Sequence, residues 1–70
     1  MNSLKPELLR EAIDDSGITM TNMAKKIGIS RESLYNKLEK KSEFSVSEIN
    51  SIQQILHLSN SARDVIFFGK

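Results

Sequence analysis

The sequence contains no cysteine and no long run of apolar residues, and it has only one proline and three glycines. Without cysteine, neither a disulfide nor a thiolate metal site can stabilise the chain. No segment approaches the roughly 20 apolar residues that a membrane-spanning helix needs. The opening residues, MNSLKPELL, show no cleavage signal. We therefore expect a soluble, cytoplasmic protein.

The chain also lacks the patterns of β-structure. Valine, isoleucine and threonine do not alternate with polar residues over a strand-length run, and neither Asn-Gly nor Asp-Gly occurs. Because 70 residues form one domain at most, we predict a single all-α domain over residues 1–70. A chain of this length buries only about 60% of its unfolded surface. Its stability must come from well-packed helices, from an oligomer, or from both.

Five helices are predicted from apolar spacing and from the signals at helix ends. The first extends from Pro6 to Ser16-Gly17. The second extends from about Met20 to Ile27 after an N-cap at Thr19, and the third from about Arg31 to Lys40 after an N-cap at Ser30. The fourth begins at the capping box Ser45–Glu48 and continues past Leu56, and the fifth extends from Ser59 or Ser61 to the end of VIFF. The residues predicted to face the core are Leu8, Leu9, Ala12, Ile13, Met23, Ala24, Ile27, Leu34, Leu38, Ile49, Ile52, Ile55, Leu56, Val65 and Ile66.

Positive charge is concentrated in the middle third of the chain. Residues 19–41 contain six basic and two acidic residues, a net charge of +4, whereas residues 1–18 carry −2 and residues 42–70 carry −1. The whole chain carries only +1, so it is the segregation of charge that indicates a face for a polyanion. An ordinary solvated helical surface explains the same charges equally well.

The second and third predicted helices meet at the short sequence IGIS. Gly28 suits a tight corner because glycine adopts positive φ without a steric cost. Ala24, a small residue, lies four positions earlier, where the two helices must approach each other. Ile29 follows the glycine, and Leu34 lies five positions after Ile29. This is the spacing of a helix-turn-helix.

The segment TMTNMAKKIGISRESLYNKL resembles the core motif of the Cro/CI-type (lambda-repressor-like, XRE) helix-turn-helix family of phage and bacterial regulators. The five-helix layout extends the resemblance over most of the chain. The resemblance implies a compact five-helix domain in a bacterial host cell. It also implies a role in a phage or mobile-element genetic switch, in which the third helix reads the major groove of double-stranded operator DNA, commonly in a homodimer. The family often has an apolar residue where this chain has Lys37, so we expect the third helix to be rolled slightly.

A helical wheel gives an independent view of the third helix. If Leu34 and Leu38 point inward, then Glu32 and Asn36 point most nearly outward. Ser33, Tyr35 and Lys37 lie on the flanks, and Arg31 lies at the exposed N-terminal end. The combination of asparagine, arginine and tyrosine favours contact with DNA over a plain solvated face.

The residues expected to read bases are Arg31, Glu32, Ser33, Tyr35 and Asn36. Arg31 is suited to guanine O6 and N7, Asn36 to adenine N6 and N7, and Glu32 to cytosine N4. Otherwise the Glu32 carboxylate repels phosphate. Tyr35 is suited to a thymine methyl group or a phosphate, or its ring lies half-buried beside the fourth helix.

The residues expected to contact phosphate are Thr21, Asn22, Ser30, Lys37, Lys40 and Lys41. Thr21 and Asn22 lie at the N-terminus of the second helix, where backbone N–H groups and the helix dipole attract anions. The three lysines are suited to non-specific contacts with the DNA backbone.

An enzyme is not expected. His57 is the only histidine, and a single histidine without cysteine provides neither a zinc site nor a catalytic pair. Asp14 and Asp15 are adjacent on a helix and point about 100° apart. No phosphate loop, nucleophile elbow or dinucleotide fingerprint occurs, and we predict no cofactor and no metal.

A protein-binding modulator is the stronger alternative. The small net charge and the carboxylate of Glu32 are both less favourable for binding operator DNA than a strongly basic surface would be. As an antirepressor, the chain would use Arg31, Tyr35 and Asn36 to bind the DNA-binding domain of a cognate phage repressor.

At the other end of the chain, Phe67 and Phe68 are consecutive. Either one of them is exposed and forms a dimer contact, or both tuck under the first helix.

Overall fold

A computed structural model describes residues 3–70, which form five α-helices and no strand. The helices are α1 (Pro6–Ser16), α2 (Met20–Ile27), α3 (Arg31–Leu38), α4 (Val46–Leu56) and α5 (Asn60–Phe68). The all-α prediction is therefore confirmed over the described part of the chain. Within this part, no helix has both the length and the apolar character needed to cross a membrane.

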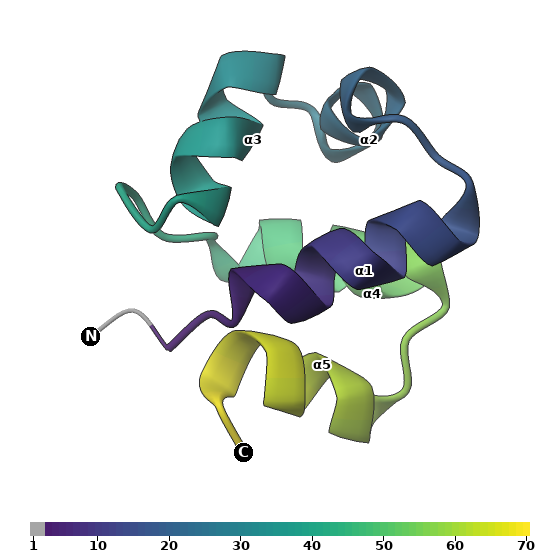
Figure 1. The fold of residues 1–70 in the computed structure, drawn as a ribbon, viewed down its shortest axis with the longest axis vertical. Coiled ribbons are helices and arrows are strands. Elements are labelled where there is room, and N and C mark those ends of the chain that lie inside the picture. Colours follow the sequence, from purple (N-terminus) through teal and green to yellow (C-terminus); the bar gives the residue numbers. More distant parts are fainter. Residues whose placement is uncertain (1–2) are drawn as a thin grey trace.

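The helices are arranged around a central pair. Helices α1 and α4 occupy the middle of the molecule, α2 and α3 lie together at one end, and α5 lies at the other (Figure 1). Helix α1 contacts both α4 and α5, whereas α2 contacts α3 and α4. The two helices that lie within the basic segment 19–41 thus form one end of the domain.

All five helices contribute to a single apolar core. Its buried side chains are Leu4, Leu9, Ile13, Met23, Ala24, Leu34, Leu38, Ile49, Ile52, Ile66 and Phe67. The rings of Phe44 and Phe67 meet edge to face with their centroids 5.6 Å apart, so the segment between α3 and α4 is anchored to α5. Leu8, Ala12, Ile27, Ile55 and Leu56, which were also predicted to face inward, are half-buried.

The exposure of the side chains at the end of α5 differs from one prediction and selects between two alternatives for Phe67 and Phe68. Val65, predicted to complete the core, is 36% exposed. Successive helical residues point about 100° apart, and the inward direction of α5 is taken by Ile66 and Phe67. Phe67 is buried and Phe68 is 47% exposed, so the two rings do not both tuck under α1.

Side-chain hydrogen bonds at the N-terminal ends of four helices stabilise these short elements. The hydroxyl groups of Thr19 and Ser30 accept the backbone N–H groups of Asn22 and Ser33. The predicted capping box is present in full, with Ser45 and Glu48 each accepting the other's backbone N–H. Ser59, rather than Ser61, caps α5. Such caps contribute about 1 kcal/mol each.

The third helix is two residues shorter than predicted. It ends at Leu38, and Lys40 adopts a left-handed conformation with φ of 64°. The backbone N–H groups of Lys40 and Lys41 return to the carbonyl oxygens of Lys37 and Asn36, which is the hydrogen-bond pattern of a Schellman motif. This end could not be recognised from the sequence, because glycine rather than lysine usually occupies the left-handed position.

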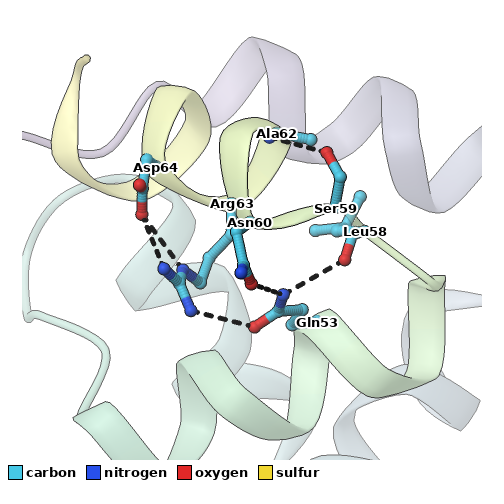
Figure 2. Close-up of polar contacts among 7 residues, drawn as sticks. All are labelled: Gln53, Leu58, Ser59, Asn60, Ala62, Arg63 and Asp64. Carbon is cyan, nitrogen blue, oxygen red and sulfur yellow. Dashed lines mark hydrogen bonds and ion pairs between the residues drawn. The ribbon is translucent and has the colours of Figure 1, made fainter.

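A polar network joins α4 to α5 at the end of the molecule away from α3. The side-chain amide of Gln53 donates to the Leu58 carbonyl and to the Asn60 side chain, while its oxygen accepts from Arg63. Arg63 also donates twice to Asp64 (Figure 2). This arginine is therefore committed to holding α5 in place.

Candidate nucleic-acid interface

The corner between α2 and α3 has the geometry that its sequence predicts. Gly28 has φ of 92°, and the backbone N–H groups of Gly28 and Ile29 both donate to the Ala24 carbonyl, at 2.9 and 3.0 Å. A Cβ atom on residue 28 would meet nothing within 4 Å, so the constraint is the backbone conformation rather than space. Ala24 is buried and Leu34 is fully buried, which holds α3 firmly against the rest of the domain.

The exposed surface of α3 is small and lies mainly at its N-terminal end. Arg31 and Glu32 are exposed, whereas Ser33, Tyr35 and Asn36 are half-buried. Burial of Leu34 and Leu38 orients this surface away from the core. Glu32 lies in the first turn, where the helix dipole favours a carboxylate.

Several polar groups of the residues predicted to contact DNA already form hydrogen bonds within the domain. The Ser30 hydroxyl donates to Ser33 Oγ at 3.0 Å while accepting the Ser33 N–H. The backbone N–H of Asn22 is bound by Thr19, so its side chain is the part of Asn22 left to meet a phosphate. Thr21 is exposed in the same turn of α2.

Two arginines lie against the Tyr35 ring. The guanidinium carbon of Arg31 is 5.5 Å from the ring centroid, and that of Arg10, on α1, is 5.8 Å away. These are cation–π distances. Arg31 and Tyr35 are four residues apart on one helix, a spacing that sequence reading can recognise. Arg10 was missed because it belongs to the acidic N-terminal segment, and nothing in the sequence connects it with Tyr35.

Lys37 is placed differently from the other two lysines predicted to bind phosphate. Its ammonium group lies 3.3 Å from the Glu48 carboxylate and donates to the Glu43 carbonyl at 3.0 Å. It also lies 5.8 Å from the Phe44 ring centroid. The Lys37 side chain is only 15% exposed. Its stem occupies the expected apolar position while its charge joins α3 to the start of α4.

Lys40 and Lys41 are exposed beyond the end of α3. Lys41 lies 3.3 Å from Glu39, but both side chains are more than half exposed, and such a surface pair contributes little. Lys40 has no ion pair among residues 3–70. Both ammonium groups are therefore accessible to an anion.

Taken together, the corner, the buried inward side of α3 and the exposed residues at its N-terminus define a helix-turn-helix DNA-binding domain. The family model described as bacterial regulatory protein, Fis family, matches residues 6–40. That segment contains α1, α2, the corner and all of α3, and it is half of the chain. The chain therefore belongs to the Fis family of bacterial regulatory proteins. Comparisons with curated proteins and with solved structures gave no match.

The family match supports one part of the earlier resemblance. It identifies a helix-turn-helix regulator that binds DNA, but it does not point to the Cro/CI type. Five helices with the helix-turn-helix formed by α2 and α3 are compatible with both.

The placement of Lys37 leads to a prediction about its role. Lys37→Met keeps the apolar stem and removes the charge that pairs with Glu48. We expect the free energy of unfolding to fall by about 1 kcal/mol, as measured by urea denaturation. The salt dependence of DNA binding should stay unchanged. If that dependence instead weakened by about one phosphate contact, Lys37 would bind DNA and the pairing with Glu48 would open in the complex.

Proposed function

We propose that this protein is a sequence-specific transcription regulator of a phage or mobile-element genetic switch, acting in the bacterial cytoplasm, with α3 reading the major groove of operator DNA. The observation that carries the proposal is the exposure of Arg31 and Glu32 at the start of a helix whose inward side chains, Leu34 and Leu38, are buried. A rigid helix presented in this way is what direct readout of bases requires. The narrower likeness to Cro/CI-type regulators rests on the motif TMTNMAKKIGISRESLYNKL, with which the five-helix layout is compatible.

Within this proposal, the two kinds of contact come from different places. Base reading is assigned to Arg31, Glu32, Ser33, Tyr35 and Asn36. Phosphate contacts are assigned to the start of α2, to the start of α3 and to the segment that follows α3, with Thr21, Asn22, Ser30, Lys40 and Lys41 as the proposed residues. The ammonium group of Lys37, which the sequence also suggested, is instead held by Glu48. Lys40 and Lys41 are the best placed of these because they are exposed.

Arg31→Ala tests base reading. A duplex selected from a random pool by the wild-type protein serves as the specific target. We expect the variant to lose about 1–3 kcal/mol of binding free energy on this duplex and to tolerate substitution at one base pair. Lys70→Ala removes one positive charge at the opposite end of the molecule and should leave binding unchanged. Equal losses for Arg31→Ala on selected and random duplexes would rule out base reading by Arg31.

A second candidate function is modulation of a repressor through the same helix. The observation that favours it is the charge on α3: Glu32 is exposed beside Arg31, and the ammonium group of Lys37 is held by Glu48. The accessible surface of α3 is therefore close to neutral, which suits a protein partner as well as it suits DNA. The partner would be the DNA-binding domain of a cognate phage repressor.

Glu32→Ala distinguishes the two functions. If α3 reads DNA, removal of the carboxylate should change the preferred base at one position or strengthen binding by reducing repulsion from phosphate. If α3 binds a basic surface on a repressor, the variant should no longer prevent that repressor from shifting its operator in a gel assay. If the wild-type protein alone shifts DNA in the gel, the result supports a DNA-binding regulator. If the wild-type protein instead prevents the repressor from shifting its operator, the result supports a modulator of that repressor.

We also propose that the protein forms a homodimer through the apolar surface shared by α4 and α5. Val46 is 74% exposed and Phe68 is 47% exposed. The two line one hollow of about 240 Å³ together with Ile49, Asn50 and Arg63. Large apolar side chains gathered at one place favour an interface. A two-fold dimer would present two copies of α3 to half-sites about 34 Å apart.

Phe68→Ser tests the dimer. The side chain is exposed, so the substitution should leave the monomer folded while removing apolar area from the interface. Sedimentation should show a dimer for the wild-type protein at tens of micromolar and a monomer for the variant. A wild-type monomer at that concentration would contradict strong self-association.

A further inference from the structure

The three arginines of this chain have different surroundings. Arg63 donates hydrogen bonds to Asp64 and Gln53 from all three of its guanidinium nitrogens (Figure 2). Within residues 3–70, neither Arg10 nor Arg31 forms an ion pair. Both are exposed, and both lie against the same ring, that of Tyr35. Two guanidinium groups that have no ion pair within residues 3–70 therefore lie against one ring.

Arg10 does not form the ion pair that is within reach on its own helix. Asp14 lies four residues later on α1, at the spacing that allows an ion pair along a helix. The arginine nevertheless lies over Tyr35 and forms no ion pair with Asp14. Leu9 and Ile13 of α1 are buried, so the helix cannot rotate to change this arrangement. The packing of α1 thus directs a positive charge from the acidic segment toward α3.

The charges of Arg10 and Arg31 repel each other unless an anion lies near both. Their distances to the ring centroid, 5.8 and 5.5 Å, place the two guanidinium carbons within about 11 Å of each other. Because this upper limit is comparable with the Debye length of about 8 Å at physiological ionic strength, screening reduces the repulsion without removing it. A phosphate group can accept paired hydrogen bonds from a guanidinium group and neutralise its charge.

We propose that Arg10, Tyr35 and Arg31 form a site for a phosphate group of the DNA backbone, with Arg10 of α1 as its principal ligand. The Tyr35 ring supports both guanidinium groups. Arg31 then enters the groove from a position fixed relative to the bound phosphate. This inference rests on the proposed DNA-binding function and adds α1 to an interface that otherwise consists of α2, α3 and the segment after α3.

The test compares four variants by the salt dependence of binding to selected and random duplexes. Arg10→Ala removes the charge, Arg10→Lys keeps the charge but loses the planar group, Tyr35→Leu removes the supporting ring, and Lys70→Ala is the control for charge. Each phosphate contact contributes about 0.9 to the slope of log affinity against log salt. Arg10→Ala should lower the slope by about this amount on both duplexes. Raising the salt from about 50 to 200 mM should therefore weaken Arg10→Ala about 3.5-fold less than the wild-type protein.

The other variants separate the charge from its orientation. Lys70→Ala should keep the wild-type slope and affinity. Arg10→Lys should keep most of the slope but bind less tightly than the wild-type protein, because an ammonium group cannot form the paired contact. Tyr35→Leu should also bind less tightly with little change in slope, since both charges remain. Thermal unfolding of each variant checks that these changes do not come from loss of the folded state.

A second measurement locates the contact on the DNA. Neutral methylphosphonate linkages are placed one at a time in the selected duplex. One linkage should weaken binding of the wild-type protein and leave binding of Arg10→Ala unaffected. If Arg10→Ala instead keeps the wild-type slope and responds to every linkage as the wild-type protein does, the phosphate role is overturned and Arg10 only joins α1 to α3. Loss of binding by Arg31→Ala in the same experiment would leave the proposed function standing. A wild-type protein without affinity for any duplex would overturn both.

Discussion

The burial of Leu34 and Leu38 is the interaction on which the rest of the interface depends. Helix α3 has only eight residues, too few to be stable as an isolated helix in water. It exists because these two side chains are almost completely removed from solvent and because Gly28 allows the chain to turn tightly enough to bring them into the core. Once Leu34 and Leu38 are fixed, the direction in which Arg31 and Glu32 point is fixed as well.

The distribution of ion pairs divides the basic residues into two groups. Lys37 and Arg63 lie against acidic side chains and are largely covered, and they hold α3 to α4 and α5 to α4. Arg10, Arg31 and Lys40 form no ion pair within the described residues. An ion pair removes one positive and one negative charge, so pairing leaves the net charge of +1 unchanged and alters only which individual charges a ligand near α3 can reach. The accessible charge is set by packing, which decides which carboxylates are already in use.

Most of the fold could be predicted from the sequence because its signals are local. Thr19, Ser30 and Ser45 cap helices through hydrogen bonds that span only three residues, so the sequence alone reveals them. The corner at Gly28 is equally local. The end of α3 was not predictable in the same way, because Lys40 adopts a conformation that glycine usually takes. The exposure of Val65 was missed because the positions of α1 and α4 beside α5 decide which face of α5 is covered.

The candidate site also combines features that are local in the sequence with features that depend on the packing of different helices. The sequence by itself determined the helix-turn-helix, the concentration of basic residues around it and the residue types offered by α3, since all of these follow from spacing along one continuous segment. Only the tertiary structure decided that Lys37 is occupied by Glu48, that Phe68 rather than Phe67 is exposed, and that Arg10 meets Tyr35. Each of these depends on residues from two different helices, and their relative position is set by the packing of the whole core rather than by any local pattern.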